Sequence, residues 1–337
     1  MKAIVLRAHG DNNLLTLESD FPDPVPEKNE VLITVKASSL NYHDVFTRRG
    51  MPGIKLQFPV IIGLDVAGEI ISLGEDVDGW NIGDRVLVDP VNRIDGGLIG
   101  ETRHGGLAEL CRVPQHQLIK LPDTVSFADA ASLPVAYGTA WRMMQSIGQI
   151  KQGEKVLILG ASGGVGVAAV QLAKLAGAYV IACAGTPEKA DRLTALGADE
   201  IILYRDADFM KIIYERHGKP ARRRHAVTPG GVDVVVNFTG GDTWVKSLRT
   251  LRIGGRLLTC GATAGYAPPE DLRYIWTFEL KIFGSNGWER EDLHALLSLV
   301  EQGKLKTVID RQWPLAEGAD ALAALEARQV FGKAVVA

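Results

Sequence analysis

The part of this chain best suited to chemistry is an apolar run that ends in a glycine-rich turn. Residues 156–159 are continuously apolar, as in a buried strand, and lead into Gly160-Ala161-Ser162-Gly163-Gly164-Val165-Gly166 and then a small-residue helix over 167–176. We expect Gly163 to let the turn close on a pyrophosphate and Gly166 to let the helix lie on the strand, while free helical amides bind the anion. Because strand and helix flank the glycines, a dinucleotide site is favoured over a structural turn. The residues predicted to hold the phosphates are Ser162, Gly163, Gly164 and Val165.

Length and composition bound the class of protein. A chain of 337 residues is expected to form two domains, and 46% apolar with 23% charged residues is typical of a soluble globular protein. The net charge of −3 gives no general attraction to nucleic acid or to an anionic membrane. Residues 3–6 look like a strand rather than a signal peptide, and no apolar run reaches a membrane-spanning length, so we expect a cytoplasmic protein. The three scattered cysteines indicate reduced thiols rather than disulfides.

The pattern along the chain changes once, near residues 125–135. Before it lie short β-type runs separated by Gly, Pro and Asp; after Ser126, a predicted helix cap, strands and helices alternate. Six apolar runs are the strands expected for a parallel sheet buried on both faces: 155–159, 179–184, 200–203, 232–238, 256–260 and 281–284. We therefore predict an α/β domain over 129–284 and a β-rich domain made of 1–128 and 285–337.

Several short motifs carry a resemblance to a known family. They are Ser39-Leu40-Asn41-Tyr42-His43-Asp44, Gly63-Leu64-Asp65-Val66-Ala67-Gly68, Gly83-Asp84-Arg85-Val86, Gly105-Gly106-Leu107-Ala108-Glu109 and Gly332-Lys333-Ala334-Val335-Val336. With the turn above, they make the whole chain resemble the medium-chain dehydrogenase/reductase superfamily. Ala161 and the Asn41-x-x-Asp44 motif look like its zinc-independent quinone oxidoreductase branch. The resemblance implies a Rossmann doubly wound parallel sheet that binds the cofactor, a GroES-like catalytic domain, and a homodimer formed through the edge strand at 281–283.

The resemblance also indicates that the catalytic zinc of related alcohol dehydrogenases is missing. The positions of the three zinc ligands read Asn41, Leu64 and Val135 here, and two apolar side chains offer no lone pair to a metal. Residues 89–106, where those relatives carry four structural cysteines, contain none. We interpret Glu101 and His104 in that shortened loop as ordinary surface residues, and predict no metal site.

The residues after the second strand favour NADPH over NADH. NAD sites place Asp or Glu about twenty residues beyond the glycine motif, and this chain has Gly185 there, followed by Thr186 and Lys189. Without the carboxylate there is room for a 2′-phosphate, with a hydroxyl and a cation beside it. The resemblance adds Tyr204, followed by Arg205, to this pocket. The alternative is that Lys189 and Arg205 are ordinary exposed charges.

A protein without a metal is suited to conjugated acceptors. Simple ketone reduction develops a full alkoxide charge, which zinc enzymes meet with a Lewis acid. An enone, enoyl thioester or quinone spreads the charge onto an enolate or phenolate oxygen, which a few hydrogen bonds can stabilise, each by roughly 3 kcal/mol.

The family match places Asn41, Tyr42 and His43 at the reacting centre. Asn41 is the candidate amide donor to the substrate oxygen, and Tyr42 or His43 the candidate proton donor; an unperturbed imidazole titrates near neutrality. Each has a structural alternative: Asn41 as a cap, Tyr42 as core, His43 as a supporting group. Asp44 is expected to orient the loop or Arg48 rather than to meet substrate.

The remaining cofactor contacts follow from topology, because ligands bind at the carboxyl ends of parallel strands. The residues predicted to line the nicotinamide end are Thr139, Asn237, Thr239, Gly261, Ala262 and Asn286. Trp288 is either a substrate wall or a packing residue. The basic run at 219–229 lies on a helix-to-strand loop at the opposite edge of the sheet, which favours a solvated loop or partner contact over a phosphate site.

Two functions remain open. The first is an NADPH-dependent reductase of a small quinone or of the C=C bond of an enone or enoyl thioester, and the intact Asn41 to Asp44 motif favours it. The second is a non-catalytic NADPH-binding sensor or structural protein of the same fold. The physiological substrate does not follow from the residues, because fold does not determine substrate.

Overall fold

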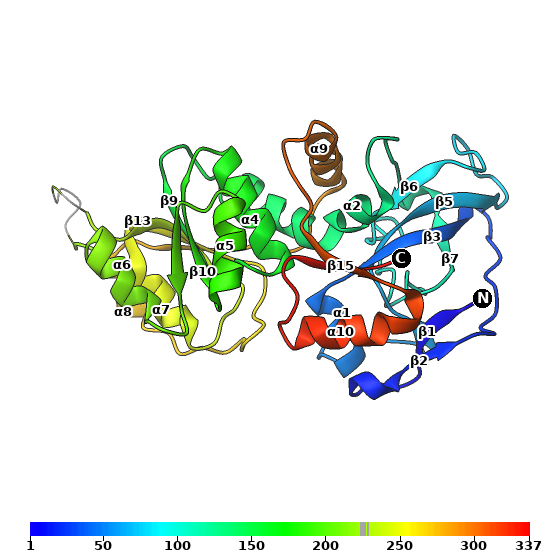
Figure 1. The fold of residues 1–337 in the computed structure, drawn as a ribbon, viewed down its shortest axis with the longest axis horizontal. Helices are drawn as coiled ribbons and strands as arrows, with labels where there is room; N and C mark the ends of the chain where they lie inside the picture. The colour runs from blue at the N-terminus through cyan, green and yellow to red at the C-terminus, as the bar shows by residue number, and fades with distance from the viewer. Residues whose placement is uncertain (223–226, 228) are drawn as a thin grey trace. The chain divides into compact units, whose positions relative to one another are not determined.

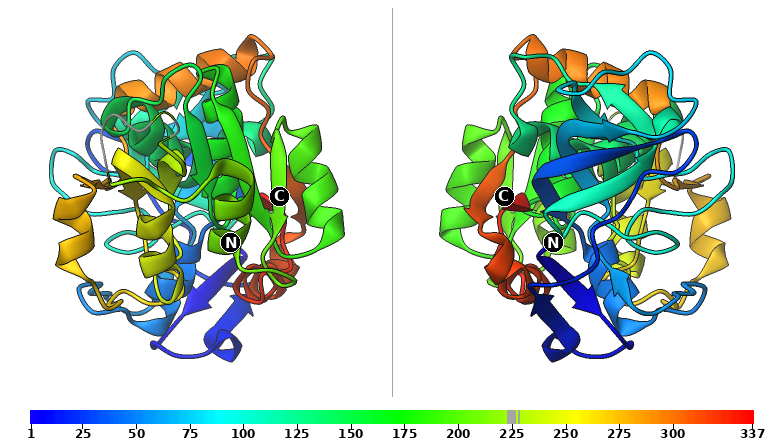
Figure 2. Two further views of the ribbon diagram at one scale, coloured as in Figure 1. Left: turned by 90° about the vertical axis from the view of Figure 1, so that its left-hand side faces the viewer. Right: turned by 90° about the vertical axis from the view of Figure 1, so that its right-hand side faces the viewer.

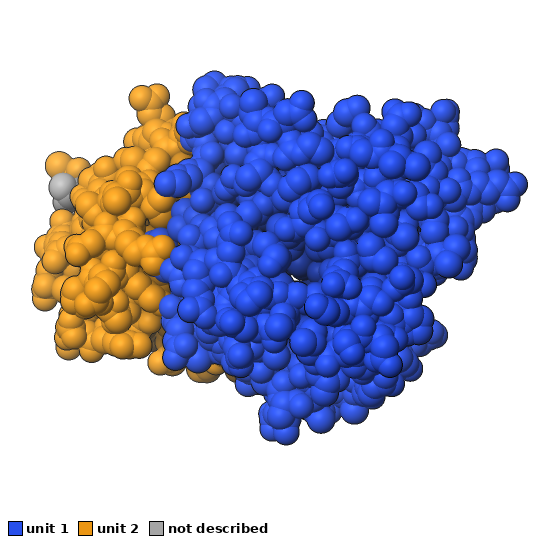
Figure 3. Space-filling view, turned by 45° about the vertical axis from the view of Figure 1, so that its right-hand side comes forward, with its two compact units in different colours: residues 1–136, 290–337 blue, residues 137–289 orange. Residues whose placement is uncertain are grey.

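The computed structural model describes residues 1–222, 227 and 229–337, traced in Figure 1. Part of the basic run at 219–229, including Arg223, Arg224 and His225, lies outside the described residues. The chain divides into two compact units, coloured separately in Figure 3: unit 1 comprises Met1–Ala136 and Arg290–Ala337, and unit 2 comprises Tyr137–Glu289. Both junctions fall a few residues after the boundaries expected from the sequence.

Unit 2 is built on a parallel sheet of six strands, in the order β11-β10-β9-β12-β13-β14 (Figure 1). The strands are β9 (Lys155–Ile158), β10 (Tyr179–Ala184), β11 (Glu200–Leu203), β12 (Val232–Val236), β13 (Leu251–Thr259) and β14 (Lys281–Gly284). All six runs predicted from the sequence form these strands, and the doubly wound order confirms the Rossmann prediction. β11 and β14 are the edge strands, and three of the four residues of β14 are exposed.

One helix, α3, precedes the strands of this sheet, and the other helices of unit 2 connect them. The helices are α3 (Thr139–Trp141), α4 (Gly164–Leu175), α5 (Pro187–Ala195), α6 (Phe209–His217), α7 (Thr243–Thr250) and α8 (Leu272–Thr277). Small residues of α4, such as Ala168 and Ala169, are fully buried, so this helix lies close to the sheet. The core includes Leu157 and Ile181 from neighbouring strands, with Leu248 from α7. Such apolar residues give the strands two buried faces.

Unit 1 is a β-rich domain with two sheets. The larger has the order β15-β16-β3-β5-β6-β8, with β7 also paired to β3, and the smaller has the order β2-β1-β4. The strands are β1 (Ala3–Leu6), β2 (Leu15–Glu18), β3 (Glu30–Leu40), β4 (Val60–Ile61), β5 (Asp65–Leu73), β6 (Arg85–Val88), β7 (Leu110–Pro114), β8 (Leu118–Lys120), β15 (Ile309–Trp313) and β16 (Lys333–Val336). The C-terminal β16 pairs with β3, so that Ala334 lies opposite Leu40. This pairing brings the end of the chain to the Asn41 motif.

The helices of unit 1 also join distant parts of the sequence. They are α1 (Tyr42–Arg49), α2 (Phe127–Ala131), α9 (Arg290–Glu301) and α10 (Gly318–Glu326). The predicted cap at Ser126 is confirmed, since its side chain accepts from the Asp129 backbone N–H. α10, red in Figure 2, lies beside the blue N-terminal segment, where the Asn12 amide donates to the Ala319 carbonyl at 2.8 Å. Among the helices of the described residues, none is long and apolar enough to span a membrane.

Candidate active site

The glycine-rich turn of unit 2 is shaped by two glycines with different tasks. Gly160 has φ +67°, and a Cβ on it would lie 2.9 Å from the Phe238 ring. A Cβ on Gly166 would lie 2.3 Å from the Gly160 carbonyl oxygen, which no real side chain tolerates. Gly166 therefore has the packing role predicted for it. Gly163 closes the turn through its backbone N–H, which donates to the Gly160 carbonyl at 3.0 Å, but its φ is −83° and a Cβ there would make only an ordinary 3.6 Å contact, so the positive φ of the turn is at Gly160.

The start of α4 is suited to bind an anion. Gly163 is the N-cap residue, and glycine has no side chain with which to cap the first amides of the helix. Ser162, Gly163, Gly164 and Val165 are all partly exposed, whereas the next residue, Gly166, is buried. No protein atom would clash with a Cβ at Gly163. The close approach of a bound ligand is therefore a sufficient reason for the glycine at this position. The predicted phosphate contacts thus lie together at one helix N-terminus.

The ribose end of the predicted site contains a tyrosine where an NAD enzyme needs room for a carboxylate. A Cβ on Gly185 would lie 2.7 Å from the Tyr204 hydroxyl and 3.6 Å from Nε of Arg205. An Asp or Glu side chain at this position would therefore have to displace the exposed Tyr204 ring. Thr186 is less free than predicted, because it caps α5 by accepting from the Lys189 N–H at 3.4 Å, and its hydroxyl donates to Glu188. Arg205 is exposed, so its charge is accessible to a ligand.

At the nicotinamide end, the predicted residues separate into two groups. Asn237 is fully buried: its amide donates to the Thr243 and Ser247 hydroxyls, and its carbonyl accepts from the Thr239 and Gly240 N–H groups. Its side chain therefore shapes the loop after β12 and has no group left for a cofactor, contrary to expectation. Thr239, Gly261, Ala262 and Asn286 are at least partly exposed after their strands, and Thr139 is nearly buried.

Trp288 is a packing residue in unit 2. It is 6% exposed, and a Cβ on Gly138 would lie 2.9 Å from its ring. Because the indole fills the space above a glycine of the same unit, the structure supports the packing interpretation of Trp288.

In unit 1, Asn41 lies in a buried network of hydrogen bonds. Its amide nitrogen donates to the Asp65 carboxylate at 2.8 Å and to the Ser39 carbonyl at 3.3 Å, while its carbonyl accepts from the Lys333 ammonium. Lys333 also donates to the Leu40 carbonyl at 2.9 Å and lies 3.3 Å from the Asp65 carboxylate. The Asn41 amide is thus fully used inside the protein and is not, as it stands, an open donor for substrate.

Burial changes the acidity of this network. Desolvation raises the pKa of Asp65, although the Lys333 charge and the Asn41 amide lower it in part. Desolvation likewise lowers the pKa of Lys333, against the opposing effect of the Asp65 and Asp44 carboxylates. Asp44 is fully buried and its pKa rises to about 6 for the same reason, although its carboxylate accepts from the Asn41 N–H at 2.7 Å and the Gly63 N–H at 3.1 Å. Asp44 therefore orients the start of α1, whereas the Arg48 guanidinium is bonded to Gly10, Asn12 and Glu326.

This part of unit 1 does not fit a catalytic zinc. Leu64 is 2% exposed and apolar, and Val135 contributes only its backbone N–H, which donates to Asp65 at 3.0 Å. The single oxygen donor, Asn41 Oδ1, already faces the Lys333 ammonium, whose positive charge would repel a metal cation. Within the described residues there is also no group of three or more His, Cys, Asp or Glu side chains placed to hold a metal.

His43 and Glu101 form an ion pair that sequence reasoning missed. His43 Nε2 makes a short contact with the Glu101 carboxylate, which also accepts from the Thr47 hydroxyl at 3.1 Å. The Glu101 side chain is only 11% exposed, so it is not the surface residue that we expected. Burial alone would lower the pKa of His43, but the Glu101 hydrogen bond and charge, with Asp44, outweigh it and raise the pKa. Tyr42, by contrast, packs edge-on against Phe46.

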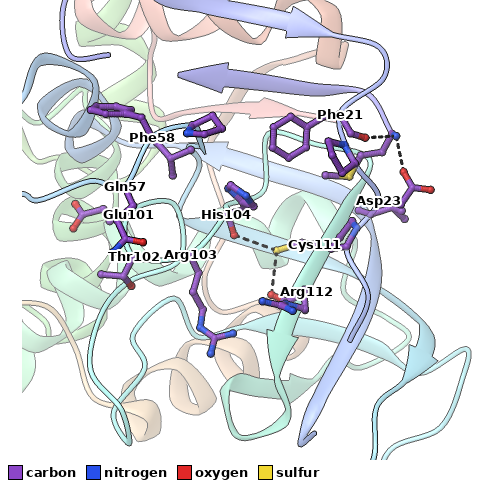
Figure 4. A pocket seen from close by; sticks show the side chains of 16 residues that line it. Phe21, Asp23, Gln57, Phe58, Glu101, Thr102, Arg103, His104, Cys111 and Arg112 are labelled. Carbon is purple, nitrogen blue, oxygen red and sulfur yellow. Dashed lines mark hydrogen bonds and ion pairs between the residues drawn. The ribbon is translucent and has the colours of Figure 1, made fainter. Parts of the chain in front are cut away.

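Close backbone packing holds Glu101 in place. A Cβ on Gly100 would lie 3.1 Å from the Gly63 nitrogen, and one on Gly105 would lie 2.4 Å from the Gly63 carbonyl oxygen. The loop that carries Glu101 therefore packs directly against Gly63, whose backbone N–H also donates to the Asp44 carboxylate. A hollow of about 530 Å³ lies along this loop, and its lining includes Glu101, Thr102, Arg103 and His104. Figure 4 labels these side chains. His104 is exposed within the hollow, as a surface residue would be.

The residues missed from the sequence are Glu101, Asp65 and Lys333. Asp65 and Lys333 belong to the motifs that carry the family resemblance, so their places in Gly-Leu-Asp and Gly-Lys-Ala were a usable signal. Glu101 carries no such signal, because it lies in none of the motifs that carry the resemblance.

Comparison with known proteins gives matches over most of the chain. Residues 27–123 match the alcohol dehydrogenase GroES-like domain, and residues 164–302 match the zinc-binding dehydrogenase family. A crotonyl-CoA reductase from Streptomyces collinus is 32% identical, over 87% of this chain and 75% of its own length. A human quinone oxidoreductase is 30% identical, over 95% of this chain and 92% of its own length.

The solved structures that resemble this chain include a 2-octenoyl-CoA carboxylase reductase in complex with NADP and 2-octenoyl-CoA. It superimposes with a TM-score of 0.87 at 29% identity, covering 99% of this chain and 87% of the other. The two domains of the fold, the glycine-rich turn and the relatives all indicate the same superfamily. The chain belongs to the medium-chain dehydrogenase/reductase superfamily of NAD(P)-binding oxidoreductases.

Proposed function

We propose that this protein is an NADPH-dependent reductase that transfers hydride, without a metal, to a quinone or to the C=C bond of an α,β-unsaturated carbonyl compound. The observation that carries the proposal is the network around Asn41. An ammonium, an amide and a carboxylate occupy the position where a zinc-dependent relative needs its ligands. An acceptor that delocalises its own developing charge needs no Lewis acid, which favours conjugated substrates over simple ketones.

The cofactor preference rests on the surroundings of Gly185. Tyr204 fills the space that a ribose-binding carboxylate would need, and the Arg205 guanidinium lies close by. Without a carboxylate at Gly185, no negative side chain at this position repels a 2′-phosphate, and the Arg205 guanidinium attracts it. The amides at the start of α4 would hold the pyrophosphate. When bound, NADPH supplies the hydride; the proposed contacts at its nicotinamide end are Thr139, Thr239, Gly261, Ala262 and Asn286.

We assign different tasks to the three residues proposed for catalysis. His43 is the proposed proton donor, because Glu101 favours its protonated form. Asn41 positions α1 through its buried hydrogen bonds, and Tyr42 is a second candidate contact to substrate. The relatives support both acceptor classes, since they include a quinone oxidoreductase and a crotonyl-CoA reductase. We further propose that the exposed edge strand β14 pairs two subunits into a homodimer.

The test is a fluorescence titration of chelator-treated protein with NADPH and NADH, followed by addition of 1,4-naphthoquinone or but-3-en-2-one. We expect NADPH to bind at least tenfold more tightly and to be consumed with an acceptor. Tight binding without consumption of either acceptor would instead favour a non-catalytic NADPH-binding protein. Tighter binding of NADH would overturn the cofactor assignment at Gly185.

A further inference from the structure

We propose that His43 and Glu101 act as a paired acid that protonates the α-carbon of an enolate, so that the substrate is an α,β-unsaturated carbonyl compound rather than a quinone. This inference rests on the proposed function and narrows its substrate class. Glu101 is a positioning residue in it, because it acts through His43 and does not itself meet substrate.

The first support is that only one of the two imidazole nitrogens of His43 is hydrogen-bonded within the described residues. Nε2 is bonded to the Glu101 carboxylate, and the structure records no hydrogen bond from Nδ1 to any described residue. The His43 side chain is 35% exposed, whereas Glu101 is 11% exposed. One nitrogen is therefore bound to a carboxylate, and the other remains available to a ligand. This is the arrangement by which a buried carboxylate orients a histidine for proton transfer.

The second support is that the pair is fixed before any ligand binds. His43 is in the first turn of α1, which is held at its start by Asp44 and at its end by Arg48, whose guanidinium makes two 3.0 Å contacts with Glu326. On the other side, Thr47 donates to Glu101 at 3.1 Å. In Figure 4, Glu101 lies on a loop that continues past the hollow through Thr102 and Arg103. A side chain held from both sides loses little entropy when it reacts.

The third support is the charge state. Burial disfavours the imidazolium, but the charges that face it, Glu101 from the loop and Asp44 from its own helix, are both negative and raise the pKa of His43. His43 in this pair therefore holds its proton more firmly than a free imidazole does.

A proton held on His43 is needed to reduce an enone but is not needed to reduce a quinone. Hydride added to the β-carbon of an enone moves the C=C electron pair toward the carbonyl oxygen and forms an enolate. The electron pair returns to form a C–H bond at the α-carbon with the proton from Nδ1, leaving neutral His43, which solvent reprotonates. The net reaction consumes one NADPH and one proton. A quinone accepts hydride to give a hydroquinone anion, whose oxygen takes its proton from water, so it needs no positioned acid.

The experiment compares two acceptors in the same protein. kcat/KM is measured with saturating NADPH for but-3-en-2-one and for 1,4-naphthoquinone, in the wild type, Glu101→Gln, Glu101→Asp and His43→Gln. We expect Glu101→Gln to lower enone kcat/KM by thirtyfold or more while quinone kcat/KM changes less than threefold, and Glu101→Asp to recover part of the enone rate. Glu109→Gln is the matched control, because it makes the same change at an exposed carboxylate of the same domain and should alter neither rate.

Two further readouts separate proton donation from structural damage. Enone reduction by the wild type should fall as pH rises through the raised pKa of His43, and the fall should move to lower pH in Glu101→Gln. A crotonyl thioester reduced in deuterium oxide should carry α-deuterium in one configuration with the wild type and in both with His43→Gln. The quinone rate and the NADPH titration report whether each variant is folded.

Each outcome decides the inference. Equal loss of both rates in Glu101→Gln and in Glu101→Asp, or an unchanged enone rate, would overturn it. A wild type that reduces the quinone but neither the enone nor the thioester would overturn the inference and leave the proposed function standing. A wild type that binds NADPH but reduces none of the three would overturn both.

Discussion

The candidate functional residues fall into two halves, one within each unit, and the two halves are assembled in opposite ways. In unit 2, the turn from Gly160 to Gly166 places its anion-binding amides within a few consecutive residues, and glycines do the work through the backbone. In unit 1, Asn41 meets Lys333 across 292 residues of sequence, and His43 meets Glu101 across 58. The first half depends on the absence of side chains, and the second depends on side chains that only the fold brings together.

This difference predicts how substitutions would destabilise each half. Adding a Cβ to the local turn creates a clash at one point, whereas removing one member of the distributed network leaves its partners buried and unpaired. Unpaired buried charge is the more expensive fault. The predictions below test this contrast, from the largest expected effect to the smallest.

Lys333→Met should cause the largest loss of stability. It leaves the Asp65 carboxylate buried without its ammonium, which costs about 3–5 kcal/mol in comparable buried pairs. The folded-state pKa of Asp65 is already raised and should rise further, so the loss should be small in acid, where Asp65 is protonated, and grow as pH rises. The measurement is the urea unfolding midpoint of unit 1 at pH 5 and at pH 8.

The double variant Lys333→Met/Asp65→Asn is the control for that prediction. It removes both charges and should recover part of the stability at pH 8. A loss that is the same at both pH values, or that the second substitution does not relieve, would show that the ion pair is not the reason for the effect.

Gly166→Ala and Gly163→Ala should separate packing from ligand binding in the local half. The Gly166 Cβ would lie 2.3 Å from a backbone oxygen, so we expect a loss of at least about 1–3 kcal/mol without any ligand. The Gly163 Cβ makes only a 3.6 Å contact, so unfolding should change little while NADPH affinity falls at least tenfold. Thermal unfolding and NADPH titration of both variants measure this; equal effects would contradict it.

Arg205→Ala tests the charge beside Gly185. Removing an exposed cation that contacts a 2′-phosphate should weaken NADPH binding by about five- to tenfold, or roughly 1 kcal/mol, and leave NADH binding unchanged. Titration of the same variant with both nucleotides supplies its own control. A parallel loss for both would assign Arg205 to another part of the cofactor.

Thr47→Val should have the smallest effect. It removes one 3.1 Å hydrogen bond to Glu101 and leaves the ion pair with His43 in place. A hydrogen bond to a carboxylate contributes about 1.5–3 kcal/mol to folding stability. The charge that raises the pKa of His43 is kept, however, so enone kcat/KM should fall only two- to fivefold. A fall as large as that of Glu101→Gln would mean that Thr47, rather than charge, keeps Glu101 against His43.

Patterns of neighbouring residues predicted much of the fold. All six strands of the parallel sheet, the cap at Ser126 and the packing role of Gly166 followed from apolar runs and local backbone requirements. The apolar residues Leu64 and Val135 at the metal-ligand positions could be read directly once the family resemblance was recognised. These features are local, because a strand or a turn is specified by the few residues that form it.

The tertiary structure decided which polar groups are occupied and which are available. Asn41 and Asn237 are buried amides with every group paired, Glu101 supports His43, and the turn takes its positive φ at Gly160 rather than Gly163. None of this could be read from spacing, since each depends on groups brought together from separate elements. Sequence by itself determined the elements and the kinds of side chain they carry. Only folding determined their partners, because burial, hydrogen bonding and charge act through distances in space and not along the chain.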